Sequence, residues 1–124
     1  MYALRRTAMR IAVCDGSAAA ADELREWIRQ YCLLYGIAAD IECFRTPEEL
    51  DGADIDIAFV CFGGRAGFLT ARKLRDRRCR VILVDDNGEY ATEGVRIHCS
   101  DFIVRPITFA KVVRSMALAL RDLR

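Results

Sequence analysis

Five short apolar runs, each followed by polar or turn-forming residues, set the pattern of this chain. They cover residues 9–14, 37–44, 56–62, 80–84 and 101–104. The run at 37–44 alternates between apolar and polar positions, whereas the runs at 56–62 and 80–84 are almost continuously apolar. Short runs rich in β-branched residues predict strands, and continuous ones predict strands that are buried on both faces.

Between the runs, apolar residues recur at three- and four-residue steps, which is the spacing of one face of a helix. Ser17 precedes the first such stretch and Gly36 follows it, as a helix N-cap and a helix stop do. Thr46, Pro47 and Glu49 have the residue types of a helix start, including a capping box. Helices are therefore predicted at 18–35, 46–50, 67–75, 89–95 and 108–123.

Five strands alternating with five helices predict right-handed crossovers and a parallel sheet with helices on both faces. The doubly wound, flavodoxin-like α/β order 2-1-3-4-5 suits this length, with residues 1–124 as a single domain and a core at about 9–121. In such a sheet the functional crevice lies beyond the carboxyl ends of the strands. This topology brings Asp15, Cys61 and Asp85 to one pocket.

The composition and net charge argue against binding of nucleic acid or of an anionic membrane. The 124 residues are 53% hydrophobic and 30% charged, with a formal net charge of +1, so no global charge attracts nucleic acid or an anionic membrane. The dense basic runs at 5–10 and 72–80 are interpreted as solvated faces rather than binding patches. We therefore predict no direct binding of nucleic acid.

The six cysteines carry no metal-binding or redox motif. They show no C-x-x-C spacing, so free thiols in a reducing compartment are the prediction. The first residues lack the apolar segment of a signal peptide, and no run reaches the roughly 18 apolar residues of a membrane span. The protein is predicted to be cytoplasmic and to have no membrane contact. The cysteines are Cys14, Cys32, Cys43, Cys61, Cys79 and Cys99.

One segment, "EYATEGVRIHCSDFIVRPI" at 89–107, resembles a motif of the receiver domains of two-component response regulators. "IAVCD" at 11–15 and "GFLTARKLR" at 67–75 add to the resemblance, which covers nearly all of residues 9–121. The chain is most similar to the receivers that precede LytTR-type DNA-binding domains. Receivers phosphorylate themselves on an aspartate at the end of the third strand, with Mg²⁺ held by that aspartate and an acidic pair.

The resemblance implies a degenerate phosphorylation site. Cys61 stands at the phosphoacceptor position, and only Asp15 of the acidic pair is kept, because Gly16 replaces its neighbour. A thiol cannot form the acyl phosphate, and Mg²⁺ prefers hard oxygen ligands. The chain is therefore interpreted as a pseudo-receiver that is not an enzyme and needs no cofactor, with residual Mg²⁺ binding not expected.

The resemblance also assigns the positions that bind the phosphoryl group and those that change state with it. Asp85 takes the place of the Thr or Ser, and Arg105 that of the Lys, with Pro106 after it as in the family. We hypothesise that Asp85 and Arg105 form a salt bridge that imitates the contact between lysine and phosphoryl group. Phe102 matches the aromatic switch position, and Tyr90 belongs to the same predicted switch surface.

The resemblance also implies how such a domain works. In receivers, the surface of the last two helices and last strand changes state and binds partners. Residues 88–120 are therefore the predicted partner face, with Phe102 as its internal reporter. A homodimer is the first expectation, and a histidine kinase or an effector domain, such as a LytTR domain, is the next.

Other interpretations of the same pocket stay open. An alternative interpretation of Cys61 is a redox sensor, with Cys14 on the neighbouring strand as its nearest thiol. Asp15, Asp85 and Asp86 form a weak candidate metal site, in which Asp86 is as compatible with a solvent-facing position as with a ligand.

Two further features are candidates for binding or catalysis. Gly63-Gly64-Arg65 is a candidate phosphate loop of a flavin or nucleotide module, although it matches no known spacing. His98 is the single histidine and is assigned to packing or the surface.

Overall fold

The computed structural model describes residues 8–123 and contains a five-stranded parallel sheet. The strands lie in the order β2-β1-β3-β4-β5, and each neighbouring pair is parallel. This order confirms the predicted doubly wound topology. The strands are β1 (Met9–Cys14), β2 (Ala39–Phe44), β3 (Ile57–Val60), β4 (Arg80–Asp85) and β5 (Asp101–Val104).

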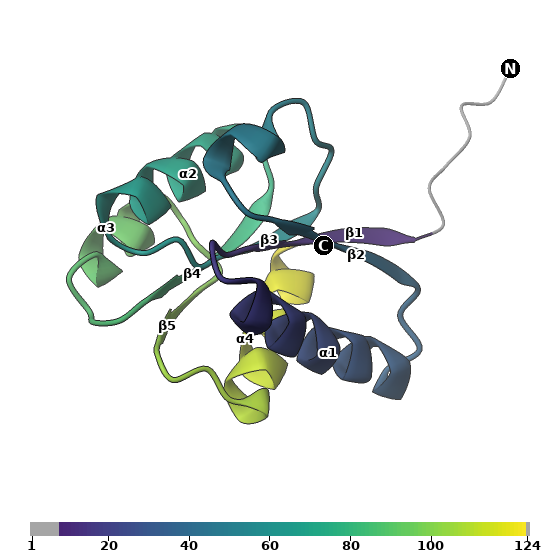
Figure 1. Cartoon of the computed structure of the whole chain (residues 1–124). Coiled ribbons are helices and arrows are strands. Elements are labelled where there is room, and N and C mark those ends of the chain that lie inside the picture. The colour runs from purple at the N-terminus through teal and green to yellow at the C-terminus, as the bar shows by residue number, and fades with distance from the viewer. Residues whose placement is uncertain (1–7, 124) are drawn as a thin grey trace, which may run out of the picture.

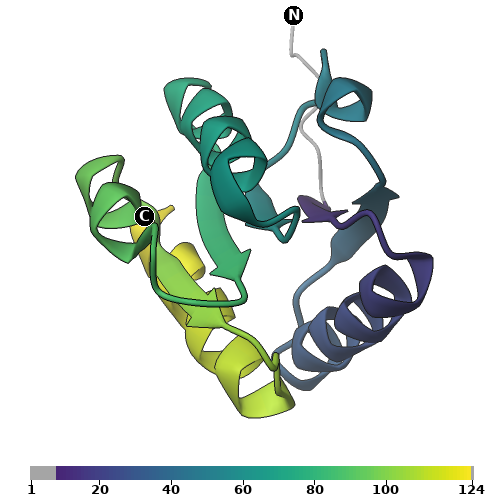
Figure 2. The same ribbon diagram turned by 60° about the vertical axis from the view of Figure 1, so that its left-hand side comes forward.

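Helices cover both faces of the sheet. One face carries α2 (Gly64–Asp76), α3 (Ala91–Arg96) and the short 3₁₀-helix η1 (Pro47–Leu50), and the other carries α1 (Ala18–Leu34) and α4 (Phe109–Asp122) (Figures 1 and 2). The two long helices of the second face begin at side-chain caps, as expected for Ser and Thr at N-cap positions. The sheet is thus the middle layer of three.

Two hydrophobic layers hold the helices to the sheet. Leu24, Ile28 and Met116 pack with Phe59 between the sheet and the α1–α4 pair. Leu74 belongs to the opposite layer, beneath α2. Because successive residues of a strand point to opposite faces, β3 and β4 contribute to both layers, which explains their continuously apolar sequences.

The predicted helix at 46–50 is wrong as a full helix, since only the four residues of η1 form. Thr46 makes no side-chain capping bond, and the Glu49 carboxylate accepts the N–H of Arg45 at 2.6 Å instead of closing a capping box. The chain then turns at Gly52, where φ is 75°. The crossover from β2 to β3 therefore lacks a helix comparable to α2.

Several boundaries also differ from the predictions. The helix expected at 67–75 begins earlier, at Gly64, so the loop after β3 is shorter than the sequence suggested. The strand expected at 56–62 ends at Val60, and Cys61 follows it. Gly63 and Gly64 make the turn with φ values of 82° and 58°, which glycine adopts readily.

The structure bears on the expectations for membrane spans, cysteines and basic runs. None of the helices between residues 8 and 123 is long and apolar enough to cross a membrane. All six cysteines are free thiols. Most of the basic run at 72–80 is exposed, as predicted for a solvated face, whereas the first three residues of the run at 5–10 lie outside the described part of the chain.

Candidate functional site

The carboxyl ends of four strands bring side chains together in one cluster, at the place of the pocket that the topology predicted. Asp15 follows β1, Cys61 follows β3, Asp85 ends β4 and Arg105 follows β5. Backbone hydrogen bonds fix them in place: the N–H of Cys61 donates to the carbonyl of Cys14 at 2.7 Å, and the N–H of Arg105 donates to the carbonyl of Asp85 at 2.9 Å. The pocket residues are therefore extensions of the sheet rather than parts of long loops.

The guanidinium of Arg105 spans this pocket. Its Nη2 donates to the carbonyl oxygen of Cys61 at 2.7 Å, and its Nη1 lies 3.0 Å from Oδ1 of Asp86. The same Nη2 lies 3.8 Å from Oδ2 of Asp15. The planar fork of arginine suits such contacts in several directions. One side chain after β5 thus ties together the ends of β1, β3 and β4.

The carboxylate of Asp85 makes a different set of contacts from those predicted. Its Oδ2 accepts the backbone N–H of Gly64 at 2.9 Å, and its Oδ1 accepts the N–H of Asp86 at 2.7 Å. The carboxylate therefore lies at the N-terminus of α2, where the helix dipole favours a negative charge. The hypothesised salt bridge joins Arg105 to Asp86 and Asp15 instead, because backbone amides hold the buried carboxylate of Asp85.

Close packing at Gly63 belongs to the same arrangement. A Cβ at this position would lie 3.4 Å from Oδ1 of Asp85, and the φ of 82° is one that other residues rarely adopt. The N–H of Gly64, which a phosphate-binding loop would need, already binds the Asp85 carboxylate. The flavin or nucleotide interpretation of Gly63-Gly64-Arg65 therefore gains no support.

Cys61 is buried at the position where the resemblance places the phosphoacceptor. Its side chain packs in the layer under α1 and α4, and its Sγ lies 3.7 Å from the carbonyl oxygen of Phe59. Burial raises the pKa of the Cys61 thiol far above its usual range, and the Asp15 carboxylate raises it further against the opposing charge of Arg105. The thiol is therefore protonated and a poor nucleophile at neutral pH.

The proposed thiol partner lies on the other side of the sheet. Cys14 packs in the layer under α2, whereas Cys61 packs in the opposite layer. Burial also raises the pKa of the Cys14 thiol well above its usual range. This arrangement disfavours a disulfide between the two residues and hence a redox switch built from them.

The oxygen ligands of a receiver-type Mg²⁺ site are not assembled. Oδ1 of Asp15 accepts the N–H of Ser17 at 2.9 Å, and Oδ2 faces Arg105. Gly16 has no side-chain oxygen, and amides hold the carboxylate of Asp85. Among residues 8–123, no group of three or more His, Cys, Asp or Glu side chains is placed to hold a metal. The carboxylates that a hard divalent cation would need are thus already bound to backbone amides or face Arg105.

Two of the predicted switch residues, Phe102 and Tyr90, lie in the layer beneath α2 and α3. Phe102 packs close to Gly94, where an added Cβ would lie 3.7 Å from its Cδ2. Tyr90 stacks on Phe68 with ring centroids 5.5 Å apart. Pro106 is exposed, and its carbonyl accepts Nζ of Lys111 at 2.8 Å. The aromatic residues therefore connect α2, α3 and β5.

Two contacts of the site were not predicted from the sequence. Gly64 supplies an amide to Asp85, and Lys111 binds the carbonyls of Val104 and Pro106. Asp86 does reach into solvent, yet it also pairs with Arg105. The Gly-Gly pair was the one signal for the amide contact. His98 is exposed and follows α3 with a φ of 62°, before β5 rather than at the pocket end of that strand.

Comparisons with known proteins place this architecture among solved structures. No protein-family model and no curated protein sequence matches the chain. It is similar to the response regulatory domain of MrkE from Klebsiella pneumoniae, with a TM-score of 0.75 and 16% identity over 94% of this chain and 100% of that one. It is also similar to the response regulator DrrB, an OmpR/PhoB homologue of Thermotoga maritima (TM-score 0.74, 18% identity), covering 94% of this chain but only 54% of DrrB.

A third similar structure is a LuxR-family DNA-binding response regulator from Staphylococcus aureus. Its TM-score is 0.69 and its identity 8%, over 90% of this chain and 98% of that one. At such identities the likeness shows the fold. The chain therefore has the fold of a response regulator receiver domain.

Proposed function

We propose that this chain is a receiver-type regulatory module of two-component signal transduction that works without phosphorylation. The receiver fold supports a role as a regulatory module. One observation supports independence of phosphorylation: the Arg105 guanidinium and the Asp85 carboxylate occupy the pocket around a buried thiol at the phosphoacceptor position.

The chemistry follows from what each group provides. An acyl phosphate needs a carboxylate nucleophile, and its formation needs cations to neutralise the developing charge. Here Cys61 offers a protonated thiol. Arg105 already places a fixed positive charge beside Asp15, and Asp85 already places a fixed negative charge on the amides of Gly64 and Asp86. The side chains of Arg105 and Asp85 thus supply permanently the charges that phosphorylation and Mg²⁺ would otherwise bring to the pocket.

The partner face proposed for this module consists of α3, β5 and α4. Val95 of α3 is 73% exposed and Val104 of β5 is 40% exposed, whereas Phe102 lies half-buried behind them. Exposed aliphatic residues on neighbouring elements are typical of contact surfaces. We propose that a second copy of the chain binds here, and that a histidine kinase or an effector domain is the next candidate.

We also propose how the module acts, where it works and which effector it serves. The module acts by binding rather than as an enzyme, and it uses no cofactor. It works in the cytoplasm, next to a DNA-binding effector of the LytTR type that is linked to it or binds it. The similar structures include a DNA-binding response regulator of the LuxR family, which supports a DNA-binding effector but does not bear on the LytTR type.

The direct test is attempted phosphorylation. The purified domain is incubated with Mg²⁺ and a small-molecule phosphodonor, and its intact mass is measured over time. We expect no phosphoryl adduct on the native chain. A stoichiometric adduct that maps to any residue of the pocket would overturn the proposal. A receiver with an intact site, treated in parallel, confirms that the donor is active.

A further inference from the structure

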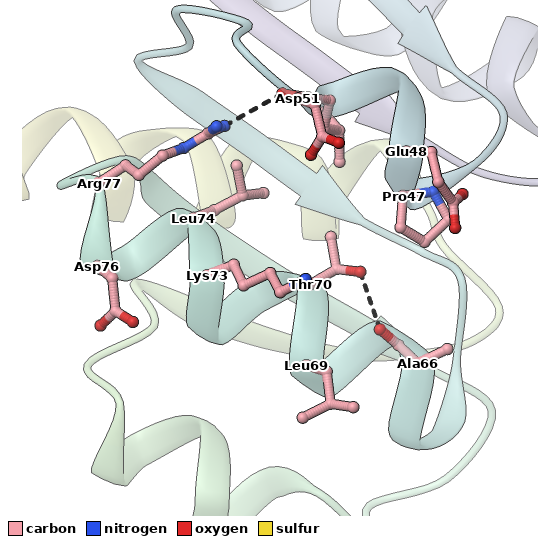
Figure 3. Close-up of a pocket in the computed structure, with 11 residues that line it drawn as sticks. Pro47, Glu48, Asp51, Ala66, Leu69, Thr70, Lys73, Leu74, Asp76 and Arg77 are labelled. Atoms are coloured by element: carbon pink, nitrogen blue, oxygen red, sulfur yellow. Dashed lines mark hydrogen bonds between the residues drawn. The ribbon is translucent and has the colours of Figure 1, made fainter.

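A groove of about 560 Å³ opens between η1 and α2, on the flank of α2 away from α3 (Figure 3). The buried Leu50 and Leu74 form its apolar floor, and the half-buried Leu69 adds to the lining, with Glu48 on the η1 wall and Lys73 on the α2 wall. This groove exists because the crossover from β2 to β3 forms only one 3₁₀ turn, where a longer helix would lie against α2.

The wall formed by α2 has the spacing of a helix-packing surface. The residues of α2 and its C-cap that line the groove include positions 66, 69, 70, 73, 74 and 77, which recur at three- and four-residue steps. Such a stripe is the contact pattern that one helix offers to another. It spans about 16 Å along the helix, since each residue rises about 1.5 Å. The groove is therefore long enough for about three turns of a helix.

Opposite charges line the two walls. On the η1 side, the charged lining residues are Glu48 and Asp51. On the α2 side they are Lys73 and Arg77, together with one acidic residue, Asp76. Arg77 closes one end by donating to the carbonyls of Leu50 and Ala53 at 3.3 and 3.5 Å. An occupant therefore meets two carboxylates on the η1 side and two cations beside one carboxylate on the α2 side.

We infer that this groove binds an amphipathic helix of a partner protein. The helix places an apolar stripe on the leucines, acidic residues along the edge that faces α2, and basic residues along the edge that faces η1. Helix-in-groove recognition uses this combination of apolar anchors and charged edges.

The test uses a synthetic peptide of about 14 residues, with leucines at helical spacing, glutamates along one edge and lysines along the other. Binding to the full chain is measured by fluorescence anisotropy, and amide NMR maps the site. We expect shifts confined to η1 and α2, and Lys73→Glu to weaken binding about tenfold. The matched control is Arg72→Glu, a neighbouring exposed cation of α2 that lies over the Phe68 ring instead of the groove. It should change the affinity less than about twofold.

A charge exchange completes the test. A second peptide, with lysines in place of the glutamates, should bind Lys73→Glu more tightly than it binds the native chain. Absence of binding, shifts outside the groove, or equal effects of the two substitutions would overturn the inference. So would self-association of the native chain that Leu69→Glu abolishes, since the groove would then belong to a second copy. Phosphorylation and the α3-β5-α4 face play no part in these readouts, so this inference fails independently of the proposed function.

Discussion

The carboxylate of Asp85 accepts the backbone N–H of Gly64 at 2.9 Å, joining the end of β4 to the first residue of α2. The same carboxylate accepts the N–H of Asp86, and both contacts are largely shielded from water. Asp85 therefore acts as a fixed anion at the start of a helix, where the resemblance to receivers places a neutral hydroxyl residue.

Replacing Asp85 by alanine should destabilise the fold. The substitution removes the charged acceptor of two partly buried hydrogen bonds, so we expect the free energy of unfolding to fall by about 1–3 kcal/mol. Urea denaturation measures this change. Asp86→Ala is the matched control, since that side chain is 79% exposed, and it should cost less than about 1 kcal/mol. Equal losses for the two variants would show that the amide contacts of Asp85 contribute little.

Gly63→Ala should also be costly. An alanine at φ 82° is strained, and its Cβ would press against Oδ1 of Asp85. A loss of about 1–2 kcal/mol is expected from the backbone conformation alone. Gly88→Ala provides the comparison, because nothing lies within 4 Å of the added Cβ and no left-handed φ is required there. If both variants melt at the same temperature, the close approach of Gly63 and Asp85 is not present in solution.

The buried thiols predict a loss of stability in alkaline solution. Burial raises the pKa of Cys99 to about 11 and that of Cys79 to about 12, from an ordinary value of 9.0, and it raises the pKa of Cys61 further. In the unfolded chain these thiols release their protons at lower pH, so the unfolded state binds fewer protons above about pH 9. The thiol contribution to stability is complete below that pH and decreases above it.

Urea unfolding under reducing conditions at a series of pH values from about 7 to 10.5 tests this thiol linkage. Cys79→Ala should reduce the slope of stability against pH above pH 9, after allowance for its lower starting stability. A free energy of unfolding that rises between pH 8 and 10 would contradict the protonated, buried state of these thiols.

Val95→Glu should weaken self-association through the α3-β5-α4 face. Because Val95 is mostly exposed, the substitution should leave the fold intact while placing a charge in the proposed contact. We expect the dimer dissociation constant to rise at least about tenfold by analytical ultracentrifugation. Leu33→Glu is the control: this side chain is 68% exposed and lies on α1. The surface is wrongly assigned if Leu33→Glu has the larger effect or if the native chain stays monomeric.

The sequence predicted most of the fold because its signals were local and consistent. Ser17 and Thr108 cap the helices that follow them, and the apolar runs of β3 and β4 are buried on both sides. The helix predicted at 46–50 did not form in full because its start residues are followed by Asp51 and by Gly52, whose φ of 75° turns the chain away from a helix.

The members of the candidate pocket could be predicted, but not how they pair. Topology alone brings Asp15, Cys61, Asp85 and Arg105 together, since parallel strands end at the same edge. The pairing depends on the early start of α2 at Gly64, which offers Asp85 an amide closer than the guanidinium of Arg105. No residue pattern distinguishes these two partners of one carboxylate.

Amide NMR during titration with Mg²⁺ and beryllofluoride, a phosphoryl mimic, tests most directly whether the pocket has lost its phosphoryl switch. The control is a Cys61→Asp, Gly16→Asp variant, which restores the missing carboxylates; a side chain at Gly16 has room, since an added Cβ meets only the Arg45 carbonyl, at 3.9 Å. We predict no specific shifts in the native chain and a response around Phe102 in the variant. Shifts near Asp15 and Arg105 in the native chain would contradict a phosphorylation-independent module and indicate a pocket that senses a metal or an anion.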